Sequence, residues 1–578
     1  MSLVATRPLT LPLLLLSSAG SAAAAAGAQG FLVADGPRSA RNRAAIGLGA
    51  SFEEALGVVM GCGEGVAKRD LTVVERALLP IWSVLPKNAH QRVEWKMLRY
   101  AAHRYFLQQS SLLVRGLEPA RQVNDSNVGS AEILSKTAPS LVDVLLEGSR
   151  SPIGFTINDA VALIATIEEL IFESESTFLE EAYRYKRKSS ELALSHKELH
   201  EVMEAYLVRW MIGSEERLVR TLINNHTFRE HAFPLWNDLS QFTEGIIKTI
   251  AFPRQRAPSA GDGHLVLEQE YSFVDAHKVA GSITRSFASY WETECQTIKT
   301  QLVALDKRAV GRISLADFYG ANADGQWRFG ESEAYLRDLG ALDESSPWHG
   351  KQVIISNYIL GASNCIVSTD HYLVCCQNGC ESTLNDIEFA IGAPVAAPGD
   401  ILSIVENITD FDDRAPRVGR ELRAQLQSIA DTHGGKVPLH GRLFAQWLHF
   451  VFPLDCPFPH KAGTYSTQTP TEFGNDFLVS QTDMGNFAAS RNGSAQAVVA
   501  EEVAEAQWMS HWSDEEELIA DYALQLQAPW SRGGCGLKVV GASAAFILLA
   551  GTVVSKKWGV LPSAKAYDVG PDGRSHYV

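Results

Sequence analysis

Helical periodicity over residues 70–305 is the feature that most limits the folds open to this chain. Apolar residues recur there every three or four positions, which is typical of helices with one buried face. Ser195 and Glu198 match a capping box, in which each side chain bonds the other's backbone N–H. The apolar stripe after it contains Leu199, Val202, Met203, Tyr206, Leu207 and Trp210. We therefore predict a mainly α protein with a helical domain at 70–305.

Two helices are expected near the start of this domain. The first follows Asp70, and Pro80 is predicted to interrupt it because proline lacks the N–H that a helix interior needs. The second is predicted from about Asn88. A longer helix is predicted from about Asp275 to Leu305.

Residues 306–480 combine a helix–loop–helix, a Cys-rich segment and a helix containing Trp447. Asp306–Asp317 resembles an EF-hand loop, but Arg308 and Val310 occupy two positions that need oxygen ligands. We expect this degenerate EF-hand-like unit to serve packing, with calcium binding unlikely and no other cofactor. β-Branched and aromatic residues between Gln352 and Cys376 predict short strands.

Disulfides are the leading interpretation of the cysteines, because half of the eight lie between Cys365 and Cys380. Adjacent Cys375 and Cys376 point to opposite faces if extended, so we expect each to bond a different partner. The candidate partners are Cys365, Cys380 and Cys456, whereas Cys295 lies on an apolar helical face and is predicted to be a free thiol. The alternatives are a redox-active vicinal pair and a zinc site of Cys365, Cys376, Cys380 and His371.

The first 28 residues are typical of a secretory signal peptide, with Arg7, an apolar core and a small-residue ending at Ala28. Residues 29–69 form a linker or a transit-like segment, since Arg38, Arg41 and Arg43 give it a basic start. The signal indicates the secretory pathway or plasma membrane. A two-part leader directing the protein to a plastid or other organelle membrane is the alternative.

Val539–Ser555 contains 17 uncharged residues between Lys538 and Lys556. At 1.5 Å per residue this covers about 25 Å, so we predict one transmembrane helix at 539–555, with a buried core helix as the alternative. Residues 481–538 would be an acidic juxtamembrane segment and 556–578 a cytosolic tail, which makes a single-pass type I protein. Four sequons in the predicted lumenal part suggest a glycoprotein, at Asn124, Asn225, Asn407 and Asn492.

A resemblance to a protein family lies in four stretches of the chain: Leu85–Phe106, Ala309–Gly320, Ser356–Glu381 and Leu439–Gly463. In them the chain resembles an uncharacterised family of predicted membrane-anchored proteins from algae and other unicellular eukaryotes. The resemblance implies one extended ectodomain and carries no activity, ligand or catalytic residue.

We predict that the ectodomain acts in binding or assembly with a protein partner. The net charge of -16 argues against nucleic acid as a partner. The alternative is a lumenal enzyme with a metal or thiol site built from Cys365–Cys380 and Cys456–His460. Weaker signals are His196 and His200, which lack the zinc-protease pattern, the glycine-rich turn Gly61–Gly65, and the carboxylates of Asp410, Asp412 and Asp413.

Overall fold

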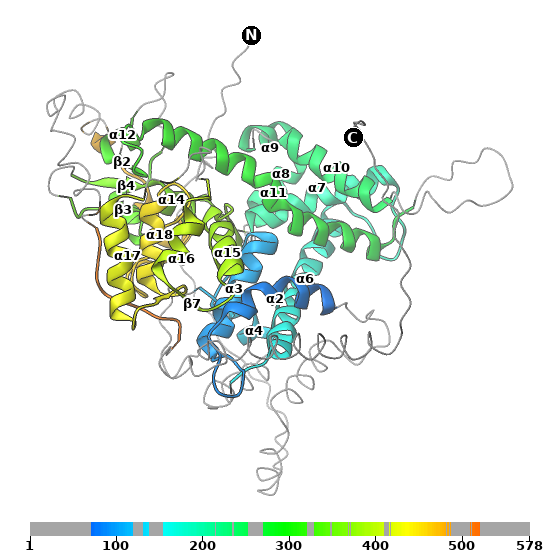
Figure 1. Cartoon of the computed structure of the whole chain (residues 1–578). Helices are drawn as coiled ribbons and strands as arrows, with labels where there is room; N and C mark the ends of the chain where they lie inside the picture. The colour runs from blue at the N-terminus through cyan, green and yellow to red at the C-terminus, as the bar shows by residue number, and fades with distance from the viewer. Residues whose placement is uncertain are drawn as a thin grey trace, which may run out of the picture.

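The computed structural model describes most of the chain between residues 71 and 520 (Figure 1). The described residues are 71–118, 131–137, 154–213, 216–233, 236–251, 270–320, 329–346, 350–367, 369, 371–409, 416, 418–480, 482–484, 486, 509 and 511–520. The predicted signal peptide, transmembrane helix and cytosolic tail lie outside them. Within the described ranges, no helix is both long and apolar enough to cross a membrane.

The first half is helical, as its periodicity predicts. Its helices are α2 (Leu71–Val84), α3 (Trp95–Ser110), α4 (Glu132–Thr137), α6 (Ile157–Tyr185), α7 (His196–Ile212), α8 (Glu216–Asn224), α9 (His226–Ala232), α10 (Trp236–Ala251) and α11 (Phe273–Leu305). α6 packs against α2 and α7, and α10 and α11 pack on α7. All six residues of the predicted α7 stripe are buried, and the Ser195–Glu198 capping box is formed.

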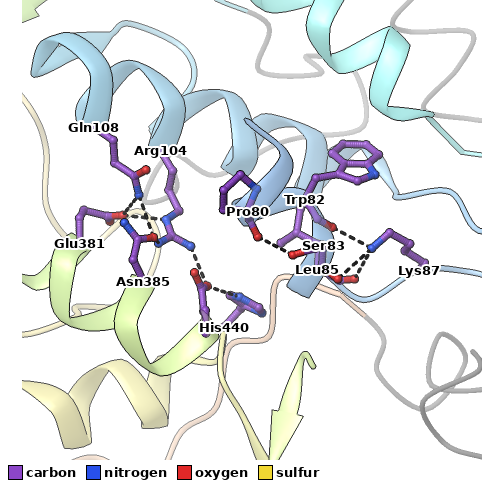
Figure 2. A network of polar contacts seen from close by, with 11 residues as sticks. Pro80, Trp82, Ser83, Leu85, Lys87, Arg104, Gln108, Glu381, Asn385 and His440 are labelled. Atoms are coloured by element: carbon purple, nitrogen blue, oxygen red, sulfur yellow. Dashed lines mark hydrogen bonds and ion pairs between the residues drawn. The ribbon is translucent and has the colours of Figure 1, made fainter. Parts of the chain in front are cut away.

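α2 continues through Pro80, so the predicted interruption is wrong. A proline inside a helix costs about 3 kcal/mol. Beyond it, however, Ile81, Trp82 and Val84 are buried, and burial of one large apolar side chain stabilises by roughly 1.5–3 kcal/mol. The buried Lys87 ammonium also donates to the carbonyl of Trp82 at 2.7 Å (Figure 2). Burial lowers the pKa of Lys87 to about 8.

α3 begins at Trp95 and not at about Asn88. The Asn88 side chain accepts hydrogen bonds from the N–H groups of His90 and Arg92, which holds a turn there. Val93 then forms an isolated β-bridge with Phe155.

Short strands flanked by helices recur four times among the described residues, with α11 as the entering helix of the first unit and two strands in the second. The first two units contain β2 (Arg312–Ser314), α12 (Leu315–Phe318), α13 (Glu333–Asp338), β3 (Leu342–Asp343), β4 (Gln352–Ile354) and α14 (Ile355–Ile359). The other two contain α15 (Gly379–Ile391), β7 (Val395–Ala396), α16 (Pro398–Val405), α17 (Arg420–Thr432), β8 (Val437–Pro438) and α18 (Arg442–Val451). β2 pairs with β4, and this antiparallel pairing joins the first unit to the second. β7 pairs with β8 in the same way and joins the third unit to the fourth.

The Cys-rich segment forms the predicted short strands. η3 (Ala362–Asn364) precedes β5 (Ile366–Val367) and β6 (Tyr372–Val374). β6 lies between β5 and β1 (Leu112–Val114), a strand that follows α3. After α18 the chain is irregular up to α19 (Pro470–Phe473) and η4 (Asn475–Phe477).

Two apolar clusters form the core. The larger runs from α2 to the Cys-rich segment, and the smaller is built mainly from α15, α16, α17 and α18. α3 lies beside α15 where the two parts meet (Figure 1).

Candidate functional site

Arg104 on α3 joins the first half of the chain to α15 (Figure 2). Its side chain is 1% exposed, and it donates to Glu381 at 2.7 Å, Glu388 at 2.7 Å and Asn385 at 2.9 Å. These three acceptors lie on one face of α15, since they are spaced four and three residues apart. A buried guanidinium needs such partners to offset its lost hydration, so this contact holds α3 and α15 together.

Glu388 also binds His440, which lies just before α18. The distance from Glu388 Oε1 to His440 Nε2 is 2.7 Å, and the carboxylate accepts this bond. Burial favours the neutral acid, but the hydrogen bond from His440 and the charge of Arg104 hold the pKa of Glu388 below its usual value. One carboxylate thereby connects α3, α15 and the start of α18.

Three disulfides hold the surrounding segments: Cys295–Cys376, Cys365–Cys375 and Cys380–Cys456. The prediction of disulfides is confirmed, and Cys375 and Cys376 bond to different partners. The predicted free thiol at Cys295 is wrong, because it bonds Cys376. The predicted set of partners is therefore right for Cys375, which bonds Cys365, and wrong for Cys376, since Cys380 and Cys456 bond each other. The apolar face of α11 lies against the Cys-rich segment, where Trp291 Nε1 donates to the Asn364 carbonyl at 2.9 Å.

These bonds exclude the predicted alternatives of a zinc site and of a vicinal redox pair. A cysteine binds zinc as a thiolate, and Cys365, Cys376 and Cys380 each belong to a different disulfide. Within the part of the chain that the structure describes, no three His, Cys, Asp or Glu residues are placed to hold a metal ion. In the disulfide-bonded state these cysteines offer no thiolate, and the enzyme alternative at Cys365–Cys380 and Cys456–His460 stays a prediction.

The four histidines of the predicted zinc site, the enzyme alternative and the weaker signals lie in separate parts of the structure, with two of them on α7. His371 precedes β6, and its backbone carbonyl accepts from the Arg115 N–H at 2.9 Å. His460 Nε2 donates to the Gly340 carbonyl at 2.7 Å. On α7, His196 lies 2.9 Å from Glu244 and His200 lies 3.2 Å from the Ser240 carbonyl, so both contact α10.

The EF-hand-like loop has its own internal bonds. Asp306 accepts from the N–H of Gly311 at 2.6 Å and of Arg308 at 3.2 Å. Ile313 and Leu315 are buried behind it, so the loop contributes to packing.

A cavity of 750 Å³, which we call the junction cavity, lies where α3, the Cys-rich segment, α15 and α18 meet. This volume is within the range of small-molecule sites, which often lie between domains. Apolar side chains supply much of its wall, among them Leu107, Leu113, Leu339, Leu360, Leu384, Leu439, Phe444, Leu448 and Phe458.

Two buried polar side chains on this wall keep a nitrogen atom without a hydrogen-bond partner among the described residues. They are His103 Nδ1 and Arg442 Nε, and both side chains belong to residues that are 8% exposed. Burial lowers the pKa of His103 to about 4, so its imidazole is neutral at pH 7. An unsatisfied buried polar group costs about 1–3 kcal/mol.

Two of the four glycosylation candidates lie on the surface. Asn225 is exposed and caps α9 by accepting from the Phe228 N–H, and Asn407 is exposed after α16. Glycosylation stays a prediction. Asn124 and Asn492 lie outside the described residues, as do Gly61–Gly65 and the carboxylates at 410, 412 and 413.

Three residues of this site were not predicted from the sequence: His103, Arg104 and Arg442. A signal was present in α3, because its buried residues include Met97, Ala101 and Tyr105 on one side, Arg99 and His103 on another, and Arg104 one heptad after Met97. Charged residues in a helix that is buried nearly all round need specific partners. Which partners they meet depends on α15 and α18.

Comparisons of the chain with protein-family models, with curated proteins and with solved structures found no match.

Proposed function

We propose that this is a binding protein that holds an amphipathic small molecule in the junction cavity. The apolar part of the ligand would contact the leucine and phenylalanine side chains, and its polar group would lie on the side of His103 and Arg442. The observation that carries this proposal is a mainly apolar cavity of ligand size with two buried nitrogen atoms that lack a partner. Apolar burial supplies affinity, and a few polar groups set the orientation.

The three disulfides fit an oxidising compartment. Together with the predicted signal peptide and the predicted span at 539–555, they support a single-pass type I protein whose binding domain is lumenal or extracellular. Protease added to sealed vesicles should remove a C-terminal tag and leave the ectodomain intact. Digestion of the ectodomain from the cytosolic side would contradict this topology.

The binding test uses the full chain in lipid nanodiscs and dansyl-undecanoic acid as the amphipathic probe, with empty nanodiscs as the blank. We expect saturable binding above the blank. Ala445→Trp, which fills the cavity from α18, should weaken it at least tenfold. His103→Leu should weaken it about threefold to tenfold, the value of one hydrogen bond. Leu79→Trp changes an exposed position on α2 and serves as the matched control. Equal binding by wild type and Ala445→Trp would overturn the proposal.

A further inference from the structure

An acidic segment from the end of the described chain crosses the start of α18. We call residues 511–520 (HWSDEEELIA) the strap. Leu518 forms an isolated antiparallel β-bridge with Gly441, and the Arg442 N–H donates to the Glu517 carbonyl at 3.0 Å. Backbone contacts therefore hold the strap against the start of α18 in a defined register.

The first residues of α18 also bond the strap, through one backbone N–H and one side chain. The Leu443 N–H donates to the Glu516 carboxylate at 3.1 Å, at a helix N-terminus where negative charge is favoured. Fully buried Gln446 donates to the Ser513 carbonyl at 3.1 Å and accepts from the Ser513 N–H at 3.2 Å.

Two ring contacts hold the first residues of the strap. His511 stacks on Phe458 with ring centroids 4.1 Å apart, and Trp512 lies 5.9 Å from Phe450. Lys461 pairs with Glu515 at the surface.

The strap also forms part of the wall of the junction cavity, through Glu517, Leu518 and Ile519. The Ala462 N–H donates to the Glu517 carboxylate at 3.0 Å, which connects the strap to the loop at Ala462, another part of the cavity wall. The strap contains no helix and only a single-residue bridge. It can therefore leave its seat without unfolding α18, because few backbone hydrogen bonds would break.

We propose that the strap is a gate whose detachment from α18 admits and releases the ligand of the junction cavity. This inference rests on the proposed function and adds its regulation. A gate changes both the association and the dissociation rate, so kinetics test it directly.

The test fixes the strap to the residue before α18 with an engineered disulfide, made by Gly441→Cys and Leu518→Cys. A Cβ atom at Gly441 would lie 3.0 Å from Leu518 Cδ2, so the two side chains face each other, and φ of -94° suits any residue there. Cys62 and Cys535, which belong to none of the three disulfides, are replaced by serine in every protein compared. The reference is the pair Gly441→Ser and Leu518→Ser, which has the same size and forms no bond.

We expect dansyl-undecanoic acid to associate and dissociate at least tenfold more slowly with the cysteine pair than with the serine pair. Non-reducing peptide mapping verifies the engineered bond. Trp512→Ala, which removes a ring contact of the strap, should speed association about threefold. Equal rates for the cysteine and serine pairs would overturn the gate and leave the proposed function standing. Absence of saturable binding to the wild type would overturn both.

Discussion

Arg104 Nη1 and Glu388 Oε1 lie 2.7 Å apart, although the two residues are 284 positions apart in the chain. The same guanidinium binds Glu381, so two carboxylates of α15 share one buried cation. This contact sets the position of α3 against α15, and both helices form the wall of the junction cavity.

Arg104→Met should lower the free energy of unfolding by about 3–5 kcal/mol, because Glu381 and Glu388 would stay largely buried without their cation. Arg220→Met is the matched control, since Arg220 pairs with Glu216 on the surface, where its side chain is 65% exposed. The control should cost less than about 1 kcal/mol. Urea unfolding of both variants measures the difference, and equal losses would refute a stabilising role for the buried contact.

The disulfides should differ in their contribution to stability according to the chain length that they close. Replacement of Cys295 and Cys376 by alanine opens a separation of 81 residues and should cost about 4.5 kcal/mol. Replacement of Cys365 and Cys375 opens a separation of 10 residues and should cost about 2.7 kcal/mol. Denaturant unfolding after non-reducing peptide mapping measures both. A larger loss for the short loop would contradict this order.

Glu175 should make the protein less stable as the pH rises from about 4.5 to 7. Burial raises the pKa of this carboxyl to about 7 from its ordinary value of 4.5, although it accepts a hydrogen bond from Tyr372 at 2.8 Å. In that window the unfolded chain releases the proton and the folded chain keeps it, so unfolding is favoured by up to about 3 kcal/mol. Glu175→Gln retains an acceptor for Tyr372 and should be more stable than the wild type at pH 8. Unfolding curves for wild type and Glu175→Gln that stay parallel from pH 4 to 8 would show the assignment to be wrong.

Gly311→Ala should destabilise the EF-hand-like loop more than Gly434→Ala destabilises the end of α17. Both glycines have positive φ, +72° and +69°, which costs an alanine about 1–2 kcal/mol. Only at Gly311 would the added Cβ also meet backbone, 2.6 Å from the Pro453 carbonyl oxygen. We expect a total loss above about 2 kcal/mol there, measured by thermal or urea unfolding. A loss at Gly434 as large as that at Gly311 would argue against the backbone clash.

Calcium should leave the melting temperature unchanged, because Arg308 and Val310 replace two oxygen ligands and Asp306 bonds backbone N–H groups of its own loop. Differential scanning fluorimetry with calcium or with a chelator checks this, since a ligand that binds the folded state raises the melting temperature. A calcium-dependent rise that Asp306→Ala abolishes would refute it.

Several features followed from residues that are close together in the sequence. The Ser195–Glu198 capping box and the α7 stripe formed as predicted, because a helix start and its apolar face depend on side chains within one or two turns. The separate bonding of Cys375 and Cys376 followed from their adjacency. The short strands between Gln352 and Cys376 followed from local composition.

Other features depended on segments that only the tertiary structure brings together. Pro80 stays inside α2 because the residues after it are buried, and Cys295 bonds Cys376 because α11 lies against the Cys-rich segment. The junction cavity needs α3, α15, α18 and the strap at once. The sequence therefore determined that most of the first half is helical and that the cysteines of the Cys-rich segment form disulfides, since local propensity and spacing act over a few residues. Partners separated by 81 to 284 positions were decided by packing, because many different apolar faces satisfy the same local pattern.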